Sequence, residues 1–164
     1  MEDYKDYDPP ERQCDGCTAC CEGWLQAEAL GKAFFPGQPC HWKGCNGCTV
    51  YEKRPPVCSN FQCAWKINHF LPEWFKPTVS NVIPVWRRWK LAEDCNEKES
   101  GLYLCLTPMK GDISMDALTW LLNYVAAEAI NIRYSHEGRW HWVGSSDFMD
   151  WNLEGCPAPT TEPQ

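Results

Sequence analysis

The residues best suited to chemistry in this sequence are its cysteines, twelve among 164 residues. Nine of them lie between residues 14 and 63, several with only two residues between neighbours. A Cys-x2-Cys turn directs two sulfurs to one centre, and the intervening amides can donate hydrogen bonds to the thiolates, so this spacing recurs in zinc and iron–sulfur sites. The candidate metal ligands are Cys14, Cys17, Cys20, Cys21, Cys40, Cys45, Cys48, Cys58 and Cys63.

The number of metal centres stays open at this stage. Because a structural centre commonly takes four protein ligands, nine thiolates would fill two sites with one left over, or one cluster surrounded by further thiols. Adjacent Cys20 and Cys21 project in different directions and do not readily chelate one ion together. Cys95, Cys105 and Cys156 each stand alone and are interpreted as small buried apolar residues.

Three other side chains are expected to surround the metal. The Arg54 guanidinium would offset the negative charge that several thiolates leave around one centre. Tyr51 and Phe61 are expected to roof the centre and limit its exposure to solvent. His41 follows Cys40 directly, and we interpret it as a supporting or surface group rather than a ligand.

The spacing favours an iron–sulfur cluster, of the 4Fe-4S type, over zinc. The opening Cys-x2-Cys-x2-Cys run from Cys14 to Cys20 resembles ferredoxin-type motifs, in which closely spaced thiolates bind the corners of a cubane. Zinc remains the alternative, because Cys17 and Cys20 with Cys45 and Cys48 would supply the two knuckles of a zinc ribbon.

The charge and hydropathy of the chain argue against nucleic acid and membrane as partners. The net charge is −7 and the isoelectric point about 5.1, which argues against nucleic acid as a partner. Residues 1–13 are acidic and lack the apolar run of a secretory signal, and no stretch of apolar residues is long enough to span a membrane. We therefore expect a cytoplasmic protein with no membrane contact, in which thiols are metal ligands rather than disulfides.

The pattern along the chain predicts an α+β protein in four segments. Residues 1–13 are expected to be a flexible acidic arm, and residues 152–164 a flexible tail. Residues 14–78 have poor hydrophobic periodicity, which indicates an irregular region that a metal staples together. Residues 79–151 are expected to form a small α+β region packed on it.

Within this last region the sequence predicts a small antiparallel sheet and one main helix. Residues 82–91 and 101–107 have strand character, and residues 130–143 alternate as a hairpin does. The helix begins after Asp112 or Ser114 and ends near Ala129. Its buried stripe is expected to consist of Leu118, Leu121, Leu122, Val125 and Ala129.

Residues 14–78 resemble the CxxCxxCC cysteine-cluster family, also called YkgJ-like. The Tyr-x2-Arg-Pro-x2-Cys-x2-Phe-x-Cys portion matches position by position, whereas Cys45 lies in a variable region of the pattern. The matching positions are Cys14, Cys17, Cys20, Cys21, Cys40, Cys48, Tyr51, Arg54, Pro55, Cys58, Phe61 and Cys63. The resemblance implies a protein that chelates zinc or iron, and some relatives, the flagellin lysine methylases, are linked to protein methylation.

Three functions are compatible with these features. We expect a non-enzymatic protein that holds an iron–sulfur cluster for electron transfer, cluster handling or redox sensing, with a redox or cluster-transfer protein as partner. One alternative is a zinc-stabilised protein-interaction module, and another is a metal-dependent modifying enzyme such as a protein methylase. No catalytic residue is assigned, because the sequence has neither a Gly-rich dinucleotide loop nor an evident Cys/His pair.

Overall fold

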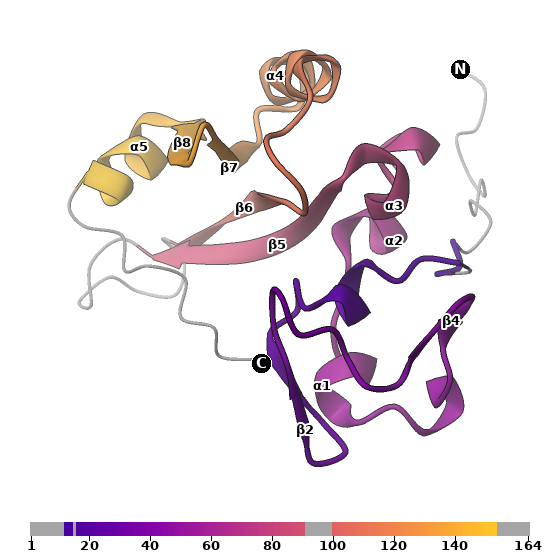
Figure 1. Cartoon of the computed structure of the whole chain (residues 1–164). Coiled ribbons are helices and arrows are strands. Elements are labelled where there is room, and N and C mark those ends of the chain that lie inside the picture. Colours follow the sequence, from indigo (N-terminus) through magenta and orange to yellow (C-terminus); the bar gives the residue numbers. More distant parts are fainter. Residues whose placement is uncertain (1–11, 15, 91–99, 154–164) are drawn as a thin grey trace, which may run out of the picture.

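The computed structural model of the chain describes residues 12–14, 16–90 and 100–153, and within them the α+β class is confirmed. Figure 1 shows two parts: a cysteine-rich N-terminal part built from short elements, and a twisted sheet accompanied by the two longest helices. Cys95 and Cys156, most of the expected arm and most of the expected tail lie outside the described residues.

The N-terminal part has no long element, in agreement with its poor hydrophobic periodicity. It contains two short hairpins, β1–β2 and β3–β4, with one 3-10 helix before them and further 3-10 and single-turn helices after them. The elements are η1 (Ala19–Glu22), β1 (Ala27–Ala29), β2 (Lys32–Phe34), β3 (Lys43–Gly44), β4 (Gly47–Cys48), η2 (Tyr51–Lys53), α1 (Pro56–Ser59), α2 (Ala64–Ile67), η3 (Glu73–Phe75) and α3 (Pro77–Ser80).

The main sheet has the strand order β5-β6-β7-β8. Its strands are β5 (Val82–Lys90), β6 (Ser100–Pro108), β7 (Asn131–His136) and β8 (Arg139–Val143). The sequence predicted an antiparallel sheet, and the β5–β6 and β7–β8 pairs are antiparallel. The β6–β7 pair is parallel instead, because α4 (Met115–Glu128) carries the chain back before β7 begins.

Helix α4 agrees closely with its predicted bounds. The Ser114 side chain caps its N-terminus by accepting a hydrogen bond from the Ala117 amide at 3.2 Å. It ends at Ala129, which adopts the left-handed conformation with φ of 51°. Leu118, Leu121 and Val125 are buried as expected, but Leu122 and Ala129 are exposed, and Ala117 takes part in the buried stripe instead.

The two faces of the sheet are covered by different helices. Leu104 and Leu106 pack with α4, while the alternate residues Tyr103 and Cys105 pack with Phe148 of α5 (Ser146–Leu153). The sequence did not predict α5. Its last two residues fall in the segment that was expected to be a flexible tail.

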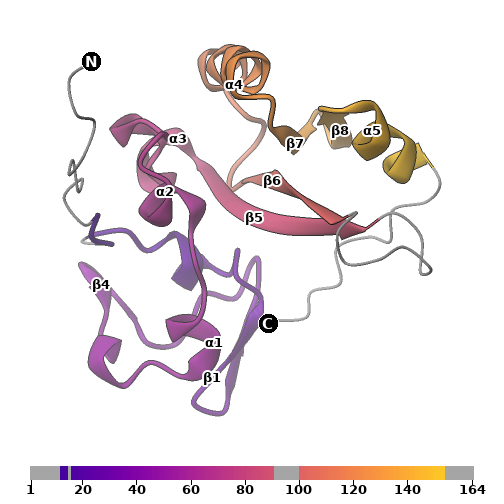
Figure 2. The ribbon, with the colours of Figure 1, turned by 180° about the vertical axis from the view of Figure 1, so that it is seen from behind.

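The cysteine-rich part joins the sheet at β5, as the reverse view in Figure 2 also shows. Helices α2 and α3 contact this edge strand, and Ala64 and Trp65 belong to the same apolar core as Leu104 and Leu121. Cys63, at the start of α2, is therefore fixed against the main core. Among the described residues, no helix is long and apolar enough to cross a membrane.

Candidate metal centre

Eight of the nine candidate cysteines line one cavity of about 330 Å³ in the N-terminal part. This volume is at the lower end of the range of about 300 to 1,000 Å³ that is usual for ligand pockets. None of the described cysteines forms a disulfide. The eight are Cys14, Cys17, Cys20, Cys21, Cys40, Cys48, Cys58 and Cys63.

The first four cysteines lie on a turn and the 3-10 helix that follows it. The Cys17 amide donates to the Cys14 carbonyl at 2.8 Å, which closes the turn between them. Cys20 and Cys21 are consecutive residues of η1, so their side chains leave the helix in different directions. Gly23 ends η1 with φ of 95°, and a Cβ there would collide with the Phe35 carbonyl.

The second group of cysteines is positioned by two contacts. The Cys40 amide donates to the Cys21 carbonyl at 2.7 Å and so holds these two segments together. In the β3–β4 hairpin, Cys48 pairs with Lys43 and lines the cavity. Cys45 lies in the two-residue turn of this hairpin, is exposed, and does not line the cavity.

The last two cysteines are positioned by two short helices, Cys58 within α1 and Cys63 just before α2. Pro55 is extended and Pro56 begins α1, whose Cys58 amide donates to the Pro55 carbonyl at 2.9 Å. Cys63 precedes α2, is only 9% exposed, and borders the main apolar core through Ala64. These prolines set the direction of the Cys58 segment.

The cysteines on the side of the sheet influence one another. Burial raises the pKa of the Cys20 thiol well above its ordinary value of 9.0, and the thiols of Cys63, Cys17, Cys21 and Cys14, in that order, raise it further. Burial likewise raises the pKa of Cys63 to about 11, with the Cys17 and Cys14 thiols contributing. The set Cys14, Cys17, Cys20 and Cys63 is called the core-side set below.

The other four cysteines form a second set of interacting thiols. Burial raises the pKa of Cys21 to about 12, and the thiols of Cys48, Cys40 and Cys58, in that order, add to the effect. Burial also raises the pKa of Cys58, followed by the influence of Cys40 and Cys48. The set Cys21, Cys40, Cys48 and Cys58 is called the outer set.

Positive side chains lie close to the thiols. Lys66, Arg54 and Lys76 each act to lower the pKa of Cys14, although its burial outweighs them. Arg54 acts on Cys58 in the same way and therefore influences both sets. Its guanidinium also lies over the Tyr51 ring at 3.8 Å and donates to the Tyr51 carbonyl at 3.0 Å.

Two tryptophans of the cavity lining have an indole N–H group without a hydrogen-bond partner. They are Trp42 and Trp65, whose N–H groups are buried and have no partner in the described part of the chain. A buried donor without a partner is costly, and a thiolate or sulfide is a suitable acceptor. The predicted neighbours Tyr51, Arg54 and Phe61 line the cavity as well.

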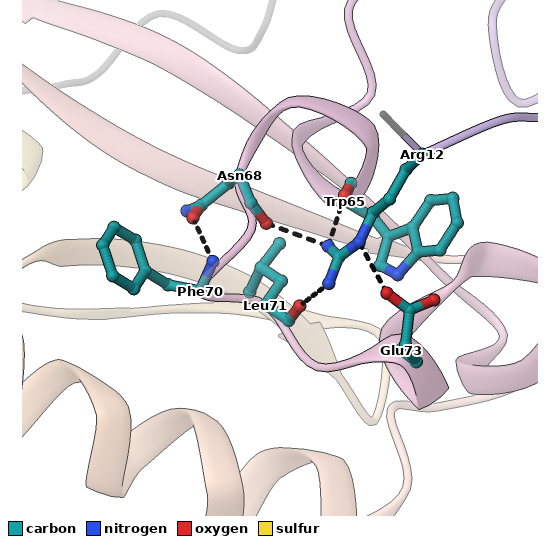
Figure 3. A network of polar contacts seen from close by, with 6 residues as sticks. All are labelled: Arg12, Trp65, Asn68, Phe70, Leu71 and Glu73. Atoms are coloured by element: carbon teal, nitrogen blue, oxygen red, sulfur yellow. Dashed lines mark hydrogen bonds and ion pairs between the residues drawn. The ribbon is translucent and has the colours of Figure 1, made fainter. Parts of the chain in front are cut away.

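Arg12 links the segment that bears Cys14 to the one that follows Cys63 (Figure 3). Its guanidinium donates to the carbonyls of Trp65 at 2.7 Å, Asn68 at 3.0 Å and Leu71 at 2.6 Å, and to the Glu73 carboxylate at 2.8 Å. It also lies over the Trp65 ring at 5.0 Å. Sequence reasoning missed this residue by placing it in the acidic arm.

The cysteines of the cavity suit a metal that prefers sulfur ligands, although their sulfur atoms are not yet close enough together to coordinate one ion. Within the described ranges, no three His, Cys, Asp or Glu side chains stand close enough together to hold a metal ion as they are. The described part of the cavity lining contains eight cysteines and no His, Asp or Glu residue. His41, weighed above as a supporting group, is exposed, pairs with Lys32 at 3.3 Å and does not line the cavity.

The chain matches no family model, no curated protein and no solved structure among the known proteins with which it was compared. The resemblance to the CxxCxxCC cysteine-cluster family therefore stays a prediction.

Replacing Arg12 with alanine should destabilise the fold around the cavity. Three partly buried carbonyls would lose a charged donor, so we expect the free energy of unfolding to fall by roughly 2 to 4 kcal/mol in urea titration. Arg12→Lys should recover only part of this, since an ammonium lacks the planar fork. Arg139→Ala, at an exposed strand position, is the control. An unchanged midpoint for Arg12→Ala would contradict this role.

Cys45 should be alkylated first among the nine cysteines when the folded protein is treated with iodoacetamide near pH 8. The reagent attacks thiolates, and raising the pKa of Cys21 from 9.0 to about 12 lowers its thiolate fraction about a thousand-fold at that pH. Peptide mass spectrometry at successive times measures the order. Guanidinium should remove the difference, and equal rates for Cys45 and Cys21 in the folded chain would refute the arrangement.

Proposed function

We propose that this protein binds an iron–sulfur cluster through the cysteine thiolates of the N-terminal cavity. The observation that carries the proposal is the gathering of eight cysteines, spread over fifty residues of sequence, around one space of about 330 Å³. Buried thiolates repel one another, and a cation among them removes that repulsion and displaces their protons. The raised pKa values of Cys20, Cys21 and Cys63 are consistent with sites whose anionic form needs such a cation.

The character of the lining supports iron–sulfur over a hard metal. Magnesium and calcium prefer oxygen ligands, whereas thiolates favour zinc, copper(I) and iron–sulfur clusters. Leu25, Phe34, Phe61 and Ile83 make much of the wall apolar. An apolar wall limits access of water and influences the potential of a cluster.

The same lining supports a role in electron transfer or cluster handling rather than catalysis. Nucleophilic or acid–base chemistry at a cysteine needs a neighbouring base. The described residues of the cavity wall include no His, Asp or Glu that could act as one. A protein partner would then exchange electrons or a cluster at the open side, where Tyr51 is 38% exposed.

The test is to purify the protein without oxygen and to record its absorbance spectrum with iron and acid-labile sulfide content. We expect a brown protein with a broad band near 400 nm, roughly where thiolate-bound clusters absorb, and with iron and sulfide in equal amounts. A variant with Cys105→Ser, a buried cysteine of β6 that packs with Phe148 and does not line the cavity, should keep the colour.

A colourless protein that carries zinc and no sulfide would reject the cluster. The cysteines would then be a folding staple for an interaction module, and chelation would unfold the N-terminal part. A protein that carries no metal after anaerobic purification and reconstitution with iron and sulfide would reject the proposed function altogether.

A further inference from the structure

We infer that the cavity holds two separate four-thiolate centres: one bound by the core-side set, Cys14, Cys17, Cys20 and Cys63, and one by the outer set, Cys21, Cys40, Cys48 and Cys58. The inference rests on the proposed function, and it assigns no ligand role to Cys45. Each centre takes a thiophilic metal group, an iron–sulfur cluster where the proposed function holds.

The first observation is that the two sets border different apolar clusters. Cys63 belongs to the main core under the sheet, and Cys17 packs against Ala19, Ile83 and Met109. The outer set has a separate neighbourhood. Cys21, Cys40 and Cys58 pack with Ala29 and Phe34 of the β1–β2 hairpin. The sets are thus held by different parts of the fold.

The boundary between the sets is the peptide bond between Cys20 and Cys21. Consecutive residues of η1 direct their side chains about a third of a turn apart, so one ion is poorly chelated by both. On the core side, the Cys17 amide donates to the Cys14 carbonyl at 2.8 Å and holds these two residues of the first set together. The Cys40 amide, bonded to the Cys21 carbonyl, fixes the second set to this point.

Each set also has a tryptophan nearby in the sequence whose indole N–H group has no hydrogen-bond partner in the described structure. Trp65, two residues after Cys63, and Trp42, two residues after Cys40, both line the cavity with buried indole N–H groups that lack a partner in the described structure. One donor accompanies each set. Hydrogen bonds to cluster or thiolate sulfur are a normal part of such sites and influence their potential.

The ligand count agrees with this division. Zinc sites and cubane clusters commonly take four cysteines, so a single centre would leave four of the eight cavity thiols without a metal. Two centres use all eight, and Cys45, exposed in its hairpin turn, is the one left over. Because Cys20 and Cys21 are adjacent, the two centres would be near neighbours.

The decisive experiment compares paired substitutions, one pair for each set, with the iron and sulfide content per chain as the readout. Cys20→Ser with Cys63→Ser, and Cys40→Ser with Cys58→Ser, should each lower the content to about half of that in the unmodified chain. Cys45→Ser should leave it unchanged. If the two pairs each abolish all metal while circular dichroism shows a folded sheet, or if one pair has no effect, the two-centre inference is wrong.

Native mass spectrometry of the unmodified chain covers the case in which a double variant fails to fold. Two equal mass increments of the metal group per chain would support the inference, and a single increment would overturn it while leaving the proposed function intact. No increment at all would instead count against the proposed function.

Discussion

The N-terminal half of this protein depends on one electrostatic constraint, the cost of ionising several cysteine thiols in a shared cavity of low polarity. Eight cysteines line that space, and burial is the largest cause of the raised pKa at Cys14, Cys20, Cys21, Cys58 and Cys63. Lys66, Arg54 and Lys76 act to lower the pKa of Cys14 without cancelling the effect of burial. A multivalent cation among the sulfurs would stabilise their thiolate form, which is why metal binding and the folding of this part are expected to be coupled.

The sheet gives this irregular part a rigid base. Trp65 and Ala64 belong to the core that α4 and β6 share, so Cys63 is positioned by packing. Arg12 also fixes the start of the cysteine run to three carbonyls that follow Cys63. The outer cysteines depend on short hairpins and single turns, which bury little apolar surface and would gain more stability from a bound metal.

The sequence predicted those helices and strands whose apolar residues recur with a regular period. The 3.6-residue stripe and the Ser114 cap located α4, and alternation located β7 and β8 around the Glu137–Gly138 turn. The parallel β6–β7 pair could not be read from alternation, because strand order depends on the route of α4. Helix α5 was missed because it is short and has only one buried residue, Phe148.

For the candidate site, the sequence predicted which residues line the cavity, but it did not predict which of them contact one another. The cysteine spacing identified the region, and Tyr51, Arg54 and Phe61 do line the cavity. The Cys45-x2-Cys48 spacing suggested a knuckle, yet these residues form a tight hairpin that turns Cys45 outward. The partners of Arg12 and the packing of Cys17 and Cys21 against different apolar clusters depend on contacts between distant residues, which no local pattern encodes.

X-ray absorption at the metal edge of the anaerobically purified protein is the most direct test of the central claim, that cysteine thiolates alone hold a metal centre. The account predicts a first shell of sulfur only, at about 2.3 Å, whether the metal is iron or zinc. A first shell that contains nitrogen or oxygen would contradict it, since His41 is exposed and the cavity wall described here has no carboxylate.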